Sequence, residues 1–120
     1  MTEVDALGAY TPTEKMNDEI PETELWSLDA TLTAYILPRI KAFRKMERHG
    51  YPVNPDNAPE NEVEEHRAMA EWENNLLDIE NAFQLLKNVD YDPLLRSSAN
   101  KAIIEKGLKK FVKYYEHLWD

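Results

Sequence analysis

The chain has 120 residues, of which 42% are hydrophobic, and it carries a formal net charge of −9 and no cysteine. A chain of this length forms one ordinary domain with a real core, and the lack of cysteine excludes disulfides and thiolate zinc sites. The acidic surplus argues against direct nucleic-acid binding, because affinity for a phosphate backbone depends largely on Lys and Arg.

The opening residues, MTEVDALGAYTPTEK, lack the basic and apolar regions of a secretory leader, and the longest apolar run in the chain is AYIL. A membrane-spanning helix needs a much longer apolar stretch. We therefore expect a soluble, cytoplasmic protein that makes no contact with a membrane.

Residues 1–24 contain Pro12, Pro21 and a run of acids with little hydrophobic periodicity. This composition predicts a flexible acidic N-terminal arm, followed by a single helical domain over residues 25–120. The alternative is a segment that lies across the domain and is anchored by Leu25 and Trp26.

The first predicted helix lies between Ser27, a candidate N-cap, and Gly50, which is placed to close the helix in a left-handed conformation before Pro52. Apolar residues recur at helical spacing between these ends and form one helical stripe: Leu28, Leu32, Ile36, Ile40 and Phe43.

Pro38 interrupts this helix, because it has no amide to donate and its ring crowds the carbonyl of Ala34, at a cost of about 3 kcal/mol. Either one bent helix continues through Pro38, or a short helix ends near Ile36 and a second begins with Pro38 in its first turn. The stripe keeps its phase through the proline, which favours the bent helix.

The second predicted helix covers residues 59–88, after a loop in which Asn57 offers a cap. Its apolar row follows a spacing of three or four and comprises His66, Met69, Trp72, Leu76, Ile79, Phe83 and Leu86. Its outer face is acidic, with carboxylates at Glu60, Glu62, Glu64, Glu65, Glu71 and Glu73.

The third predicted helix covers residues 94–118, with Asp92 and Pro93 as its start. Gly107 makes this helix less stable by about 1 kcal/mol than alanine would, because glycine has a lower helix propensity. Close approach of another helix would explain why a glycine occupies this position. The apolar stripe of this helix is wide and comprises Ile103, Ile104, Leu108, Phe111, Tyr114, Tyr115 and Leu118. The other side of the helix carries Lys106, Lys109, Lys110 and Lys113.

Short turns between long helices favour antiparallel neighbours, so the predicted fold is an all-α, antiparallel three-helix bundle. Charge agrees with this arrangement. Residues 51–92 carry eleven acids and two bases, whereas residues 26–50 and 93–120 each carry an excess of bases. Each exposed ion pair is worth at most about 1 kcal/mol, so the pattern supports adjacency of the helices and is not a source of stability.

Three stretches, LWSLDATLTAYILPRIKAFR with the following GYP, LLDIENAF after a Trp on an acidic helix, and KGLKKFVKYYEHLWD, resemble a family of small, uncharacterised proteins of tailed bacteriophages. The family pattern is W-S-L-D-x-T…P-R-[IL]-K-x-F near the start and G-L-x-x-F…L-W-D at the end. The resemblance covers residues 25–52, 72–83 and 106–120, with Lys110 and Tyr115 departing from it. It implies a phage protein made in the cytoplasm of an infected bacterium, and it implies no activity.

No catalytic constellation is found, and we expect neither a metal nor a cofactor. Glu62, Glu65 and His66 share a helix face, but no second helix contributes matching ligands, so a solvated acidic face is the better interpretation. The enzyme worth weighing is an all-α, magnesium-dependent nucleotide pyrophosphohydrolase. Such enzymes use carboxylates from two facing helices, and the third helix offers only Glu105.

The favoured interpretation is a non-enzymatic protein–protein interaction factor that binds a host or phage protein with a basic surface. The candidate binding residues are the acids Glu60, Glu62, Glu64, Glu65, Glu71 and Glu73, together with Trp119 beside the C-terminus. A special case is mimicry of DNA, in which carboxylates imitate phosphates. Pairing of two copies across a two-fold axis, through the first helix and the stripe of the third, is a further possibility.

Overall fold

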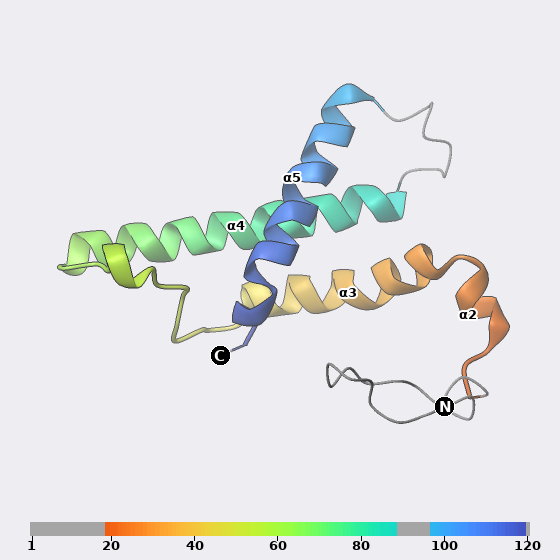
Figure 1. Ribbon diagram of the computed structural model, residues 1–120, viewed down its shortest axis with the longest axis horizontal. Coiled ribbons are helices and arrows are strands. Elements are labelled where there is room, and N and C mark those ends of the chain that lie inside the picture. Colours follow the sequence, from red (N-terminus) through yellow and green to blue (C-terminus); the bar gives the residue numbers. More distant parts are fainter. Residues whose placement is uncertain (1–18, 89–96, 120) are drawn as a thin grey trace, which may run out of the picture. The chain divides into compact units, whose positions relative to one another are not determined.

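The computed structural model describes residues 19–88 and 97–119, and all regular elements within these two ranges are helices, joined by loops and without a strand (Figure 1). The helices are α2 (Glu22–Trp26), α3 (Leu28–Lys45), α4 (Glu62–Asn88) and α5 (Ser98–Tyr114), with short 3₁₀ helices η1 (Pro55–Asn57) and η3 (Tyr115–His117). The predicted all-α class is confirmed. The chain divides into two compact units, Met1–Thr31 and Leu32–Asp120.

The first unit contains α2 and the first turn of α3. The amide of Glu24 donates to the carbonyl of Pro21 at 3.0 Å, and the hydroxyl of Thr31 donates to the carbonyl of Glu24 at 2.9 Å. The predicted arm is therefore helical from Glu22 onward, because local hydrogen bonds form there without any hydrophobic periodicity. Its residues 1–18 lie outside the described part of the chain.

Helix α3 continues through Pro38 as a single helix, so the alternative of two short helices is wrong. The carbonyl of Ser27 accepts the amide of Thr31 at 3.1 Å, as expected for a helix that begins at Leu28. Next to the proline, Arg39 donates to the carbonyl of Tyr35 at 2.9 Å and places its guanidinium over the Tyr35 ring, 3.6 Å from the centroid. These contacts brace the turn that contains the proline.

The C-terminus of α3 is closed by Arg48 and not by Gly50. The Arg48 guanidinium donates to the carbonyls of Phe43 at 2.7 Å and Arg44 at 2.5 Å, two acceptors that the end of a helix leaves open. Gly50 lies beyond the helix, and its backbone is not left-handed. The prediction of a glycine closure was wrong because a long cationic side chain satisfies the same carbonyls.

Replacing Arg48 with alanine is expected to lower the free energy of unfolding by about 1 to 3 kcal/mol, because it removes charge-assisted hydrogen bonds to the helix end and an ion pair with Glu73. Urea denaturation followed by circular dichroism measures the loss. Lys45→Ala is the control, since Lys45 is exposed in the same turn, and it should change stability by about 0.5 kcal/mol or less. Equal effects of the two variants would contradict the capping role of Arg48.

The loop before α4 contains two caps. The side chain of Asn54 accepts the amide of Asp56 at 3.0 Å and starts η1, and the side chain of Asn61 accepts the amide of Glu64 at 2.9 Å and starts α4. The side-chain amide of Asn61 also donates to the carboxylate of Glu64 at 2.8 Å, so the two residues cap the helix start reciprocally. Helix α4 therefore begins at Glu62, and the predictions of residue 59 as its start and of Asn57 as its cap were wrong.

The core of the second unit is built on one face of α4. Its buried members from α3 and α4 are Leu37, Ile40, Trp72, Leu76, Ile79 and Phe83, and α5 adds the partly buried Phe111 and Tyr114, followed by Leu118. The apolar row predicted for α4 is confirmed from Trp72 onward. His66 and Met69, which the same row includes, are exposed, because the core does not extend to the first turns of α4.

Helices α4 and α5 approach each other closely at Gly107. A Cβ atom built on Gly107 would overlap the Cβ of Ala82 and the backbone carbonyl of Asp78, so only glycine fits. The close approach expected from the sequence is confirmed, and Figure 1 shows α5 crossing α4. Helix α5 begins at Ser98 with Ser97 as its cap, whereas the start predicted at Asp92 and Pro93 lies outside the described residues.

Candidate interaction surface

The carboxylates between residues 73 and 80 of α4 pair with bases of α5, of α3 and of the residues just after α3. Arg44 of α3 bonds Glu80 at 2.9 Å and Glu73 at 3.4 Å, and Arg48 also pairs with Glu73. The hydrogen bond to Glu80 and the charges of both carboxylates raise the pKa of Arg44 above its usual value. The guanidinium therefore stays charged wherever its partners are ionised.

Helix α5 supplies the bases for the next carboxylate of α4. Asp78 pairs with Lys110 and lies 3.6 Å from Lys106. The charge alternation seen in the sequence thus corresponds to real ion pairs, at Glu73, Asp78 and Glu80. Of these, only Glu73 belongs to the predicted binding residues, and its engagement with two arginines separates it from the others.

The remaining five predicted acids lie around the first three turns of α4 and just before them, and we call this region the acidic surface: Glu60, Glu62, Glu64, Glu65 and Glu71. None of them has an ion-pair partner among the described residues. All are exposed except Glu64, which is half-buried and bonds Asn61. Glu62, Glu64 and Glu65 lie in the first turn, where the positive end of the helix dipole favours them.

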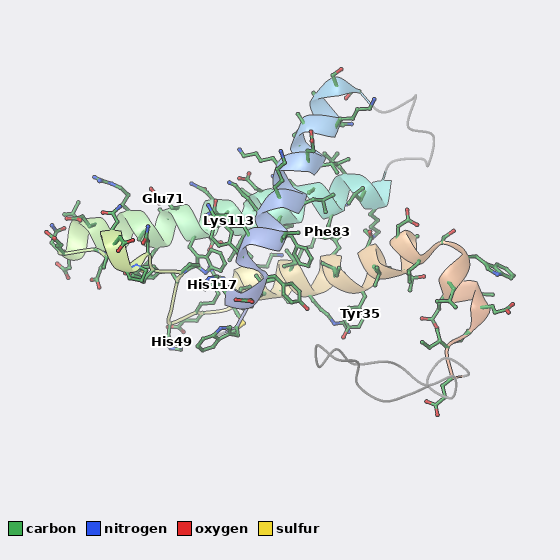
Figure 2. All side chains as sticks on the ribbon, in the orientation of Figure 1. Tyr35, His49, Glu71, Phe83, Lys113 and His117 are labelled. Carbon is green, nitrogen blue, oxygen red and sulfur yellow. The ribbon has the colours of Figure 1, made fainter. Side chains whose placement is uncertain are left out.

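Next to the acidic surface, the structure has an open hollow of about 310 Å³ between α4, the loop that precedes it and the C-terminal part of α5. Glu71 and Lys113 give its wall two opposite charges, and the edge of Trp72 packs against Tyr114, with ring centroids 5.3 Å apart. Figure 2 shows Glu71 on α4, Lys113 near the C-terminal end of α5, and His117 in η3, which follows α5. Such a hollow can receive a polar or aromatic side chain of a partner.

A second hollow, of about 300 Å³, shares His117 with the first and is also lined by His49, Tyr51 and Trp119. Trp119, the predicted contact residue, is 74% exposed at this place. The indole is thus available to a partner and forms part of the wall of a preformed hollow.

The residues that were considered for a metal do not converge. His66, Glu62 and Glu65 are exposed on α4, and no group of three or more His, Cys, Asp or Glu side chains within the described residues is arranged to hold a metal ion. The structure likewise brings no acid of α5 opposite Glu62 and Glu65 within these residues.

The sequence did not reveal that the apolar residues of α5 and η3 divide into a group that packs against the core and a group that is exposed. Ile104 is buried and Phe111, Tyr114 and Leu118 are partly buried against the core, whereas Val112 and Tyr115 are exposed. The width of the stripe was the available signal, because a helix that packs on one neighbour needs only a band of about 100°. At 3.6 residues per turn, the seven apolar positions spread over an arc of about 140°.

No helix within the described ranges has the length and apolar character needed to cross a membrane. Comparison with models of protein families, with curated proteins and with solved structures finds no match to this chain.

Proposed function

We propose that this chain is a non-enzymatic protein–protein interaction factor whose acidic surface binds a basic surface on another protein. The observation that carries the proposal is the division of charge along α4. Glu73, Asp78 and Glu80 are paired internally, whereas the five carboxylates of the acidic surface have no cationic partner within the described residues.

Glutamate side chains of α4 can either pair with bases of this chain or remain available to a partner protein. A carboxylate that already bonds an arginine gains little from a second cation, whereas five unpaired carboxylates within a few helical turns create a strong local negative potential. Such a potential accelerates encounter with a basic partner and selects against acidic ones, and its effect falls as salt rises. We expect association that weakens markedly at high ionic strength.

The resemblance to small tailed-phage proteins supports a phage origin, with a host or phage protein as the partner and the cytoplasm of the infected bacterium as the place of action. The stretches that carry it, LWSLDATLTAYILPRIKAFR and KGLKKFVKYYEHLWD, belong to α2, α3, α5 and η3. In this proposal they supply the scaffold, and the acidic surface, which lies outside the resemblance, supplies the specificity.

The scaffold that we propose is an antiparallel bundle of α3, α4 and α5 in which α3 bends at Pro38. Arg44 pairs with Glu80 and Arg48 with Glu73, so the contacts of α3 run against the chain direction of α4. On α5, Gly107 faces Ala82 and Tyr114 faces Trp72, which is again the antiparallel sense. The bend is supported by the amide that Pro38 lacks.

Mimicry of DNA is a special case of the same proposal. Carboxylates at successive helical turns offer a row of negative charge to a protein that otherwise binds phosphates. If the partner is a nucleic-acid-binding protein of this kind, duplex DNA should compete with the chain for it. If the partner binds elsewhere, DNA should leave the complex intact.

Affinity capture from infected cells with the tagged full chain, followed by mass spectrometry, tests the proposal. The wild type is compared with a variant in which the five acids of the acidic surface are changed to glutamine. The matched control neutralises five exposed acids elsewhere: Glu19, Glu22, Glu24, Glu47 and Glu105. We expect the specific partner to be lost by about tenfold or more in the first variant and retained in the control, because local charge and not net charge makes the contact.

Two results would overturn the proposal. Capture of no specific protein would remove the interaction function, and equal loss in both variants would reduce it to an effect of net charge. The competing function is magnesium-dependent nucleotide hydrolysis. Incubation with a panel of nucleoside triphosphates and magnesium tests it, and turnover that disappears in Glu62→Gln with Glu65→Gln would establish it in place of binding.

A further inference from the structure

Helix α5 and the residues after it carry an apolar stripe that no described residue covers. We call it the open stripe: Leu108, Val112, Tyr115 and Trp119. Val112 is 76% exposed and Tyr115 is 64% exposed. Leu108, Val112 and Tyr115 follow one another at spacings of four and three along α5 and the start of η3, and Trp119 follows in the non-helical residues after η3. A spacing of this kind is typical of the seam between two packed helices. Along one edge of the stripe, Tyr115 packs edge-on against Phe111, with ring centroids 5.6 Å apart.

The open stripe is also hollowed. Phe111, Val112 and Tyr115 line a depression of about 450 Å³, whose polar margin is formed by Lys113 and Glu116. The depression is open to one side, and its apolar wall lies next to the core of the unit, because Phe111 packs against Phe83 with ring centroids 5.2 Å apart. An apolar side chain from outside would therefore meet a preformed and rigid surface.

Charge along the stripe is self-complementary. Lys109 follows Leu108 and Glu116 follows Tyr115, so both charges flank the same edge of the stripe, one near each end. Neither has an ion-pair partner among the described residues, in contrast to Lys106 and Lys110, which contact Asp78.

We propose that the open stripe is the interface of a homodimer, in which α5 of two copies pack antiparallel about a two-fold axis. In this register Val112 lies opposite Tyr115 of the second copy, and Leu108 faces the end of the second copy's helix, where the chain continues to Trp119. Lys109 of each copy then lies beside Glu116 of the other. One register thus brings the apolar residues of α5 against one another and places both Lys109 and Glu116 beside an opposite charge, as an interface that uses the same patch twice requires.

A second copy fits these charges better than a uniformly charged partner. A strongly acidic helix would satisfy Lys109 and leave Glu116 against a like charge, and a basic helix would do the reverse. A parallel pairing of two copies would place the two charged edges on opposite sides of the seam, so that neither Lys109 nor Glu116 would meet an opposite charge. The antiparallel arrangement brings the two charged edges together and places Lys109 beside Glu116.

The stripe is short, so the dimer is expected to be weak and to dissociate on dilution in roughly the micromolar range. Sedimentation equilibrium of the full chain from about 1 μM to about 1 mM measures this range directly. Val112→Asp should weaken dimerisation by at least about tenfold, because it places two like charges in the apolar seam. Val63→Asp is the control, since Val63 is a 67% exposed valine of α4 outside the stripe, and it should leave dimerisation unchanged.

A charge exchange tests the register independently of hydrophobicity. Lys109→Glu and Glu116→Lys should each weaken self-association by about tenfold, because each turns both flanking pairs of the dimer into repulsive ones. The double variant should restore the wild-type dimer. Mixing the two single variants should give a heterodimer, because both flanking pairs are then attractive.

A chain that remains monomeric at about 1 mM would overturn the proposal, and so would a dimer insensitive to Val112→Asp. A dimer that the charge exchange fails to rescue would overturn the antiparallel register. The outcome is separable from that of the proposed function, because the variant with five glutamines on the acidic surface should still dimerise. Capture of a host or phage partner can equally persist in Val112→Asp.

Discussion

Replacing Leu76 with alanine is expected to lower the free energy of unfolding by about 2 to 5 kcal/mol. Leu76 is completely buried on α4, in the cluster that joins Leu37 and Ile40 of α3 to the face of α4. The substitution removes the transfer free energy of a whole side chain and leaves a cavity that two flanking helices cannot fill without moving. A domain of this size is stable by only about 5 to 15 kcal/mol, so the loss is a large part of the total.

The neighbouring residue provides a matched control. Leu77 lies on the same helix and is 37% exposed, so Leu77→Ala changes the same atoms at nearly the same helix propensity. We expect a loss of about 1 kcal/mol or less, because the side chain is already partly hydrated. Urea denaturation of both variants, with an unchanged dependence on denaturant, measures the difference. Similar losses would mean that α4 buries a different face.

The buried face of α4 was predictable from the sequence because the period of a helix fixes which residues share a side. The length of that face was not. His66 and Met69 follow the same spacing as Trp72 and Leu76, yet they are exposed, because burial also requires a neighbouring helix at that height. Periodicity carries no information on where a neighbour ends.

Helix ends were predicted less well because several residues near each end are chemically able to cap it. Asn57 and Asn61 have the same side chain, and only Asn61 has the backbone position from which it accepts the amide of Glu64. At the end of α3, Gly50 was the conventional choice, and the carbonyls are instead satisfied by Arg48. An arginine that folds back leaves no mark in the local sequence pattern.

The sign of each charged helix face was also predictable, but its pairing was not. Glu73 and Glu71 are two positions apart in the same acidic run. Glu73 nevertheless bonds Arg44 and Arg48, whereas Glu71 lines an open hollow. Which carboxylate meets a base depends on the height at which α3 lies along α4, and that height is set by core packing between residues distant in sequence. The acidic surface is what remains after these pairs have formed.

Gly107→Ala is expected to destabilise the protein by about 2 to 4 kcal/mol, although alanine is the better helix former by about 1 kcal/mol. The added methyl group would overlap the Cβ of Ala82 and the backbone carbonyl of Asp78. A flexible side chain could move aside, but a helix backbone cannot, so α5 must shift away from α4. That shift would also disturb the pairing of Lys110 with Asp78 and the packing of Phe111 on Phe83.

Whether Gly107→Ala raises or lowers the stability shows which of two effects is larger, the tertiary contact between α4 and α5 or the intrinsic helix propensity. Gly50→Ala is the control, because a Cβ at Gly50 meets nothing within 4 Å and the backbone there is not left-handed. This variant should gain about 0.4 to 1 kcal/mol by restricting the unfolded chain. Ala82→Gly in the Gly107→Ala background should recover part of the loss, giving a double variant less destabilised than the two single effects added together. If thermal or urea denaturation showed Gly107→Ala to be stabilising, the close crossing of α4 and α5, and with it the shared core of the second unit, would be wrong.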